Sequence, residues 1–406
     1  MGAPQTRMFE LAKRLTEAGD DVTVLTAFPN YPTGEVREGY RHRFAMEEDM
    51  DGVRVLRRWV FATPNAGVFR RLVNHFSFVA SSLTALRALG RTDVIFVQSP
   101  PLPIGLAAFV LSKLKRAPYI FNVSDIWPKS AVELGMLTNP LAVRLAEALE
   151  RFIYRHAARI TVPTTGIRDE LAARGIARHK LFHLTNGVDV ELFHPEPPDP
   201  TLGARIGIEG RKVFMYAGTH GLSQGLDVIL EAARLTTNQE ILYVLAGDGA
   251  DKAALVHKVE TDGIHNVRFL APQPRSSMPE LLNLAYAAVI PLKGLEVFKS
   301  ALPSKMYESM AVGQPIVASM WGQAADLVRE TGCGVVTEPG DAEALRDAVE
   351  SLAADPAAAR RMGANGRAFA VEHFNRSKIA ARLGELLLET ASGERRARAR
   401  FKASPG

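Results

Sequence analysis

The sequence is poor in cysteine and in long apolar runs. Its 406 residues include one cysteine, Cys333, which excludes an internal disulfide and a cysteine-cluster metal site, and no role is assigned to it. The longest apolar run, Leu102 to Leu111, is about half the ~20 residues that a membrane span needs, so it is interpreted as a buried helix. Because no secretory signal opens the chain, a cytoplasmic protein is expected.

Length and composition favour a soluble protein of two domains. A chain of 406 residues exceeds what one hydrophobic core normally supports, about 250–300 residues. Hydrophobic residues make up 47% and charged residues 23%, values typical of folded globular proteins. Two folded lobes are therefore the first expectation.

Charge is distributed unevenly along the chain. Residues 1–190 hold 25 basic against 18 acidic side chains, a net charge of +7, whereas residues 191–390 hold 19 against 25, a net charge of −6. The tail adds five basic side chains, namely Arg395, Arg396, Arg398, Arg400 and Lys402. The first lobe and the tail are thus predicted to meet an anionic membrane or a phosphorylated acceptor ahead of nucleic acid. A solvated tail without a partner is the alternative.

Short β-branched runs alternate with helical stretches, which predicts parallel sheets covered by helices on both faces. The runs fall in two series: 22–26, 53–57, 94–98, 119–123 and 160–163, then 213–217, 241–246, 267–270, 288–292, 316–319 and 334–337. The proline-rich stretch 194–200 marks the hinge. We predict a first domain over 1–190, a second over 191–377, a helix over 378–391 that packs back on the first domain, and a basic flexible tail over 392–406.

The first domain lacks the strand with which a doubly wound domain normally starts. The chain begins with a loop and a helix over 6–18. Without that strand, two neighbouring strands would keep unpaired backbone groups. We therefore expect the natural chain to begin upstream of Met1.

Two glycine-rich turns follow strands of the second lobe. Gly218, Gly221 and Gly225 lie between the strand at 213–217 and the helix at 226–235, and Gly247-Asp248-Gly249 follows the next strand. Such turns bring backbone N–H groups and a helix N-terminus to the strand's carboxyl edge, where a diphosphate can bind. A tight connection without a ligand would look the same.

A third segment of this lobe combines a cation and a carboxylate. Pro303 suits a first helical turn, so the Ser304 hydroxyl and Lys305 can meet a phosphate at the helix N-terminus. Glu308 lies one turn further on the same face, where it suits ribose hydroxyls. An ordinary surface ion pair is the alternative.

In the first lobe, Asp125 follows the strand at 119–123 and should lie at the carboxyl edge of that sheet. It could orient the acceptor hydroxyl or accept its proton, or it could simply cap a turn.

The segments LPSKMYESMAVGQPIV at 302–317, YAGTHGLSQGL at 216–226, NGVD at 186–189 and FPNYPTG at 28–34 together give a resemblance. The chain resembles the family 4 retaining GT-B glycosyltransferases over essentially its whole length, and is most similar to the branch found in colanic-acid, O-antigen and capsule gene clusters. The resemblance implies an α/β GT-B fold with two Rossmann-like doubly wound domains facing a cleft.

The resemblance also implies roles for individual residues. Glu308 matches the second glutamate of the family signature, which holds the donor's ribose, whereas Ser300 stands in place of the first. Thr219 and Gln224 occupy the positions of the basic pair that neutralises the diphosphate, which leaves Lys305 and Lys299 as the phosphate cations. Gly2 and Arg7 match the glycine-rich first loop and the helix that follows it, which also face the donor. The predicted donor site contains Gly2, Arg7, Gly218, Thr219, Gly221, Gln224, Gly247, Asp248, Gly249, Lys299, Ser300, Ser304, Lys305 and Glu308, and the predicted catalytic residues are Asp125, Lys305 and Glu308.

The function implied is retaining transfer of a sugar from a UDP- or GDP-sugar to an oligosaccharide or polyprenyl-diphosphate-linked acceptor, without metal or cofactor. Nucleotide-sugar 2-epimerases share the architecture, so an epimerase is one alternative. A non-catalytic partner in polysaccharide assembly is another, given Ser300, Thr219 and Gln224. No nucleic-acid partner is expected.

The stretch 68–89 is an amphipathic helix that suits the cytoplasmic face of the inner membrane. Phe69, Phe76 and Phe78 accompany Arg70 and Arg71, a pattern typical of interfacial binding. His75 in the same stretch is interpreted as a packing or interface residue.

Overall fold

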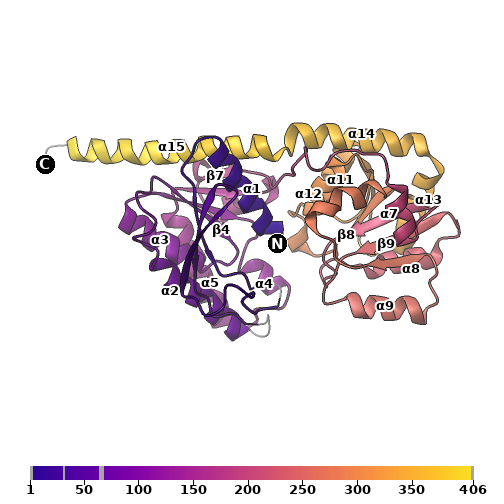
Figure 1. Ribbon diagram of the computed structural model, residues 1–406, viewed down its shortest axis with the longest axis horizontal. Coiled ribbons are helices and arrows are strands. Elements are labelled where there is room, and N and C mark those ends of the chain that lie inside the picture. The colour runs from indigo at the N-terminus through magenta and orange to yellow at the C-terminus, as the bar shows by residue number, and fades with distance from the viewer. Residues whose placement is uncertain (1–2, 31–32, 64–67, 404–406) are drawn as a thin grey trace. The chain divides into compact units, whose positions relative to one another are not determined.

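A computed structural model describes residues 3–30, 33–63 and 68–403, and the chain divides into two compact units (Figure 1). Unit 1 comprises Met1–Thr185 and Ser377–Gly406, and unit 2 comprises Asn186–Arg376. Both are α/β units whose helices lie on both sides of parallel strands, as the sequence predicts.

Unit 2 contains one sheet of six parallel strands in the order β10-β9-β8-β11-β12-β13. The strands are β8 (Lys212–Ala217), β9 (Ile241–Ala246), β10 (Val267–Leu270), β11 (Ala287–Pro291), β12 (Ile316–Ser319) and β13 (Gly334–Thr337). The helices are α7 (Pro200–Ile206), α8 (Asp227–Leu235), α9 (Lys252–Thr261), η2 (Arg275–Ser277), α10 (Met278–Asn283), η3 (Glu296–Phe298), α11 (Ser304–Ala311), α12 (Gln323–Thr331), α13 (Ala342–Ala354) and α14 (Pro356–His373).

The sequence explains the central position of this sheet. All six residues of β9 are buried, because a parallel strand covered on both faces needs a continuous apolar run. Helices start at side-chain caps: Asp341 accepts a hydrogen bond from the Ala344 N–H at 2.9 Å, and Asp355 does the same for Ala358 at 2.9 Å. Apolar residues of these strands and of the helices that pack on them form two hydrophobic clusters, one on each face of the sheet.

The strands of unit 1 form two separate sheets. β1 (Thr23–Ala27) pairs in parallel with β3 (Val53–Arg58), and β2 (Ala45–Met50) pairs antiparallel with the other edge of β3. The second sheet is parallel, in the order β4 (Ile95–Ser99), β5 (Tyr119–Val123), β6 (Arg159–Val162) and β7 (Leu181–His183). In the described residues, β1 and β4 each keep one edge without a partner strand. The helices are α1 (Ala3–Glu17), α2 (Val68–Leu83), α3 (Ile104–Lys115), α4 (Lys129–Glu133), α5 (Pro140–His156), α6 (Thr165–Ala173), η1 (Arg178–Lys180) and α15 (Arg376–Ala403).

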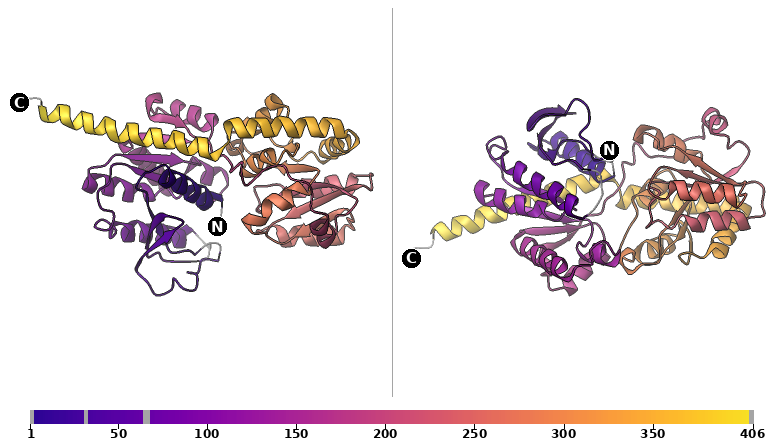
Figure 2. Two further views of the ribbon diagram at one scale, coloured as in Figure 1. Left: turned by 45° about the horizontal axis from the view of Figure 1, so that its top comes forward. Right: turned by 90° about the horizontal axis from the view of Figure 1, so that it is seen from below.

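Helices α1 and α15 hold the two sheets of unit 1 together. Leu11 and Leu15 of α1 share a hydrophobic cluster with Ile379 and Leu383 of α15, and Val22 and Phe96 pack against it from beside β1 and from β4. The first and last described helices of unit 1 accordingly run side by side in Figures 1 and 2. This cluster joins the two sheets, whose strands β1 and β4 are not paired with each other.

Three details differ from the sequence analysis. The strand β2, AMEEDM, was not anticipated because three acidic side chains make a poor strand, but Arg54 pairs with Glu47 at 2.6 Å and Arg57 pairs with Glu48 from the neighbouring strand. The strand β7 has only three residues and gives little signal. Where a flexible tail is expected from residue 392, α15 continues to Ala403, because its alanine, arginine and glutamate residues favour a helix.

Candidate active site

Three connections of unit 2 meet at one edge of its sheet. Strands β9, β8 and β11 are neighbours and parallel, so the segments that follow Ala246, Ala217 and Pro291 leave the sheet on the same side. These segments lead into α9, α8 and α11, whose first N–H groups and dipoles favour an anion. The arrangement joins the three segments that the sequence analysis singled out.

The two glycine-rich loops pack against each other. The His220 N–H donates to the carbonyl of Asp248 at 2.8 Å, and the Asp251 N–H donates to the carbonyl of His220 at 3.0 Å. A Cβ atom on Gly247 would lie 1.9 Å from the Gly218 carbonyl oxygen, and Gly247 has a φ of +144°. Glycine is therefore required at 247 for loop packing, whatever else the loop binds.

Lys305 is the central cation of the site. From the second residue of α11, its Nζ donates to the Tyr216 hydroxyl at 2.9 Å and to Gln224 Oε1 at 2.6 Å, and it lies 4.3 Å from the centre of the Tyr216 ring. The residue as a whole is partly exposed, but its ammonium group is enclosed, and this desolvation lowers the pKa of Lys305 to about 7 despite the opposing effect of Glu308. A phosphate bound beside Lys305 would supply the negative charge that stabilises its protonated form.

Tyr216 belongs to the site but was not predicted. Its ring is 1% exposed, and its hydroxyl donates to the Thr219 carbonyl at 2.7 Å while it accepts from Lys305. Burial raises its pKa, so it stays neutral. The signal was present in the sequence, because a buried tyrosine just before a glycine-rich turn needs a hydrogen-bond partner.

His220 and Lys252 also escaped sequence reasoning. His220 is fully buried, with its ring centroid 5.8 Å from that of Tyr216 and 6.1 Å from that of Phe269. Burial, and then the positive charge of Lys252, lower its pKa to about 4, so the imidazole is neutral near pH 7. Lys252 donates to the Gly247 carbonyl at 2.6 Å and fixes the second loop from the start of α9.

Glu308 lies one turn after Lys305 on α11 but pairs with a different residue. Arg275 of η2 contacts its Oε1 at 3.0 Å, and the same guanidinium lies 5.1 Å from the centre of the Phe193 ring. The carboxylate is therefore held in place while about a quarter of the side chain is still exposed. The arrangement leaves Glu308 able to accept hydrogen bonds from a diol.

The remaining predicted donor residues are placed less uniformly. Lys299 forms an ion pair with Glu296 at 2.8 Å and lies over the Trp321 ring, so the structure does not bring it into the Lys305 network. Ser304 is exposed at the first residue of α11, and Ser300 lies between η3 and that helix. Asp248 accepts a hydrogen bond from the Gly249 N–H at 2.9 Å.

Thr219, Gly221 and Gln224 all lie in the first glycine-rich loop, before α8. Thr219 is exposed and contributes its carbonyl rather than its side chain, whereas Gln224 accepts directly from Lys305. Neutral side chains thus stand at the two positions where the resemblance leads one to expect cations, which concentrates positive charge on Lys305.

In unit 1, Asp125 follows β5 at the carboxyl edge of the second sheet. Burial raises its pKa, against the opposing effects of the Ser130 hydroxyl, which donates to Oδ2 at 2.7 Å, and of the backbone at Ile126. The Asp125 carboxyl is therefore more basic than a solvated one. Its bond to Ser130, the second residue of α4, also fits the capping alternative.

Arg7 of α1 is 5% exposed, and its Nη1 lies 3.5 Å from Gln98 Oε1, at the end of β4. Gln98 Oε1 also accepts from Asn122 Nδ2 at 2.9 Å, and Asn122 Oδ1 accepts from the Thr161 hydroxyl at 2.9 Å. Arg7 is thus tied to a buried polar network across β4, β5 and β6. Gly2, predicted as its neighbour in the site, lies outside the described residues.

Within the described residues, no group of three or more His, Cys, Asp or Glu side chains is placed to hold a metal ion. In the same part of the chain, no helix combines the length and apolar character that crossing a membrane requires.

Two α/β units, one of them with glycine-rich loops and a lysine at a shared strand edge, define a nucleotide-dependent transferase architecture. Residues 2–187 match the family described as Glycosyl transferase 4-like domain, and residues 201–369 match Glycosyl transferases group 1. The chain belongs to the family 4 GT-B glycosyltransferases, and the sequence-based assignment of fold, family and enzyme class is confirmed.

Curated relatives and a solved structure agree with this assignment. The chain is 26% identical over 348 residues, 83% of this chain and 85% of the relative, to the Escherichia coli K12 protein named "Putative colanic acid biosynthesis glycosyl transferase WcaI". It is 27% identical over 318 residues, 71% of this chain and 81% of the relative, to a Mycolicibacterium smegmatis GDP-mannose-dependent alpha-(1-6)-phosphatidylinositol monomannoside mannosyltransferase. Among solved structures, Anabaena Alr3699/HepE in complex with UDP and glucose superposes with a TM-score of 0.72 at 18% identity, covering 95% of this chain and 96% of that one.

Proposed function

We propose that the protein transfers a hexose, with retention of anomeric configuration, from a UDP- or GDP-sugar to a polyprenyl-diphosphate-linked acceptor in polysaccharide assembly. The observation that carries the proposal is the Lys305 ammonium, enclosed by Tyr216 and Gln224 beside two packed glycine-rich loops. Related proteins supply the finer terms: one is named for colanic acid biosynthesis, one for GDP-mannose, and one was solved with UDP and glucose.

The proposed mechanism relies on charge stabilisation. The bond between the anomeric carbon and the terminal diphosphate oxygen breaks, while the acceptor oxygen bonds to the same face of that carbon and its proton passes to the departing phosphate. Lys305 and the N–H groups at the start of α11 stabilise the charge that develops on the diphosphate. Preorganisation of these groups means that little rearrangement is needed during the step.

Two carboxyl groups have supporting roles in the proposal. Glu308, held by Arg275, accepts hydrogen bonds from the ribose hydroxyls. Asp125 orients the acceptor hydroxyl by accepting a hydrogen bond from it, and burial, which raises the pKa of this carboxyl, strengthens that bond, while the proton itself passes to the departing phosphate.

A screen of nucleotide sugars by thermal unfolding tests the donor. A true donor at 100 times its dissociation constant stabilises the folded protein by about 2.7 kcal/mol. We expect one UDP- or GDP-sugar to stabilise the protein. The anomeric NMR signal of the transferred sugar should show the same configuration, axial or equatorial, in the product as in the donor. Product with inverted configuration, or conversion of the donor without any acceptor, would contradict the proposal.

We also propose that unit 1 binds peripherally to the cytoplasmic face of the inner membrane. Phe76 of α2 is 44% exposed, and Arg70 and Arg71 precede it at exposed positions. His75 is partly buried, and desolvation followed by the charge of Arg71 lowers its pKa. The side chains of Phe69 and of the tail residues from 394 onward lie outside the described part.

Flotation with vesicles of 30% anionic lipid tests the membrane binding. At low salt the protein should float upward with the vesicles, and protein that stays at the bottom of the gradient would contradict the proposal.

A further inference from the structure

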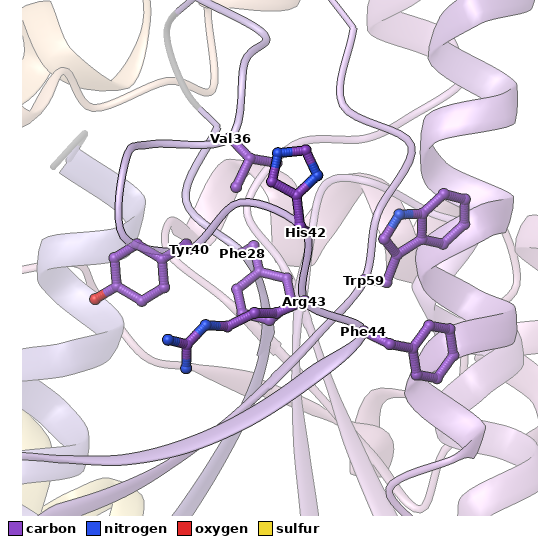
Figure 3. Close-up of a pocket in the computed structure, with 7 residues that line it drawn as sticks. All are labelled: Phe28, Val36, Tyr40, His42, Arg43, Phe44 and Trp59. Carbon is purple, nitrogen blue, oxygen red and sulfur yellow. The ribbon is translucent and has the colours of Figure 1, made fainter.

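Unit 1 contains a second feature that the catalytic proposal does not use, a pocket of about 360 Å³ that we term the aromatic pocket (Figure 3). This volume lies within the range of small-ligand sites, about 300–1,000 Å³. The pocket is lined by Phe28, Val36, Tyr40, His42, Arg43, Phe44 and Trp59.

Hydrogen bonds and a cation–ring contact hold the floor and one wall of the aromatic pocket in place. Phe28, directly after β1, is 2% exposed, and its N–H donates to the Arg58 carbonyl at the end of β3 at 3.2 Å. Tyr40 donates its hydroxyl to Glu48 at 3.1 Å, and Arg57 covers its ring at 5.1 Å from the centroid. The pocket is therefore preformed, which lowers the entropic cost of binding.

The opposite wall is apolar and exposed. The side chain of Phe44 is 55% exposed and that of Trp59 is 41% exposed. The backbone N–H of Trp59 donates to the Phe44 carbonyl at 2.9 Å, so the two residues are neighbours on one surface. In Figure 3 both rings lie on one side of the pocket, whereas Tyr40 and the guanidinium of Arg43 lie on the other side.

The apolar surface continues beyond the pocket. Phe61, 42% exposed, donates its N–H to the Ser77 hydroxyl at 2.8 Å, which ties it to α2 next to Phe76. Contiguous exposed aromatic side chains on a soluble protein usually mark a binding surface.

Basic side chains outnumber acidic ones near the pocket, although Glu48 is bonded to Tyr40. Residues 52–92 contain seven arginines and no aspartate or glutamate. Arg43 contacts only the Met46 sulfur at 3.7 Å, and no ion pair involves it within the described residues. His42 is held at a φ of +59°, a conformation that side chains other than glycine rarely adopt and that is often kept for a ligand. The rim therefore suits an anion.

The lining decides between two classes of ligand. A sugar would need side-chain acceptors for its hydroxyl groups as well as donors, but in the described part of the chain the lining contains no carboxylate or amide, and the Tyr40 hydroxyl is already bonded to Glu48. Aromatic walls with a guanidinium and an imidazole at the rim instead suit an apolar chain that ends in a phosphate.

We infer that the aromatic pocket binds the first isoprene units and the adjoining phosphate of a polyprenyl-phosphate lipid. At about 30 Å³ per heavy atom, as for liquid water, the pocket holds about twelve atoms, which corresponds to the phosphate and one to two isoprene units. The rest of the chain would lie along Phe61 and Phe76. This inference rests on the proposed function, because the lipid-linked acceptor supplies both the chain and the phosphate.

Calorimetric titration of the full chain with farnesyl phosphate, below its micelle concentration, tests the inference. We expect saturable binding, about tenfold weaker binding for Phe44→Ser and for Arg43→Gln, and unchanged binding for the exposed-residue controls Leu145→Ala and Arg91→Gln. Farnesol lacks the phosphate that Arg43 would contact, so it should bind the wild type and Arg43→Gln equally. Inorganic phosphate and methyl glucoside should show no saturable heat.

Several outcomes would overturn the inference. These are farnesyl phosphate binding equally to wild type and to a folded Phe44→Ser variant, binding of inorganic phosphate as tight as that of farnesyl phosphate, or preference for the glucoside. Because thermal unfolding reports folding of each variant, Arg43→Gln decides the matter if Phe44→Ser does not fold.

Failure of the proposed transferase reaction is distinguishable. Farnesyl phosphate binding with no sugar transfer to any lipid acceptor would contradict the proposed function and leave the pocket's assignment standing. Transfer to a polyprenyl-linked acceptor that is unaffected by Phe44→Ser and Arg43→Gln would contradict the pocket's assignment alone.

Discussion

The two units of this protein use the same α/β elements differently. Unit 2 has one unbroken sheet, so three neighbouring strand ends bring their loops to one place and concentrate the candidate donor chemistry there. Unit 1 has its strands in two sheets, with the Asp125 and Arg7 network on one and the aromatic pocket beside the other. In unit 2 the continuous sheet therefore brings the candidate site residues together at one edge. In unit 1 the division into two sheets places the candidate binding features apart from each other.

In each unit, burial moves the pKa of an ionisable group among the predicted catalytic residues toward neutrality. The pKa of Lys305 in unit 2 is lowered, and that of Asp125 in unit 1 is raised. Groups perturbed by desolvation at a strand edge are candidates for chemistry. The two differ in their partners, because Lys305 is bonded to the side chains of Tyr216 and Gln224, while Asp125 is bonded to the Ser130 hydroxyl and to the backbone of Ile126.

The largest effect on activity is expected at Lys305 of unit 2. We expect Lys305→Ala to lower kcat/KM for transfer about 10²- to 10³-fold, because the developing diphosphate charge loses its main cation. Lys258→Ala, a lysine on α9 paired with Glu231, should change kcat/KM less than twofold. Steady-state kinetics on both variants provide the measurement, and near-normal turnover of Lys305→Ala would refute its assigned role.

The packed loops of unit 2 should be intolerant of a methyl group. Gly247→Ala places Cβ against the Gly218 carbonyl and should reduce the free energy of unfolding by about 2–3 kcal/mol and weaken UDP binding. Gly263→Ala is a matched control, because Gly263 also has a positive φ but no atom within 4 Å of the added Cβ. Chemical denaturation should show about 1 kcal/mol for the control, and equal effects of the two changes would contradict the clash.

Donor affinity should fall with rising pH through the Lys305 pKa of about 7. An anionic diphosphate favours the ammonium form, so the dissociation constant of the donor sugar nucleotide should rise about tenfold between pH 6.5 and 8.5. The same shift makes the unfolded chain bind more protons above pH 7, so the free energy of unfolding should increase from pH 7 toward the ordinary lysine range.

Lys305→Met serves as the control for this pH dependence. Both trends should be flat in that variant, as measured by calorimetry and denaturation across the range. A steep trend that persists in Lys305→Met would assign the titration to another group.

The smallest effect is expected at Arg275. Arg275→Ala releases Glu308 from a partly exposed ion pair, so KM for the donor should rise about threefold with little change in kcat, in keeping with the roughly 1 kcal/mol of such pairs. The exposed pair between Arg329 and Asp326 provides a control in Arg329→Ala. A large loss of kcat in Arg275→Ala would instead place the arginine at the reacting groups.

Much of the fold could be predicted because buried parallel strands have a strong signature. Tyr119–Val123, Ile241–Ala246 and Ile316–Ser319 are short, mainly apolar runs in which every residue is buried. By contrast β2 depends on ion pairs with β3, and such long-range contacts leave no local pattern. The continuation of α15 was missed because its charge suggested a solvated tail, although its residues favour a helix.

The candidate site was predictable to a similar extent. The glycine-rich turns and Lys305 have recognisable local contexts, so their presence at one sheet edge follows from strand order. The partners Tyr216 and Arg275 could not be paired with α11 from the sequence, because they lie 89 and 33 positions away from Lys305 and Glu308 respectively. The aromatic pocket, likewise, arises only when the segment after β1 folds against the end of β3.

The contact between Gly247 and Gly218 has a consequence for engineering this enzyme. Exchange of donor preference with a relative by grafting the 218–225 loop alone would pair a foreign backbone with the native 247–251 turn, which approaches it too closely to adapt. The two segments form one transplantable module, and chimaeras should carry both together.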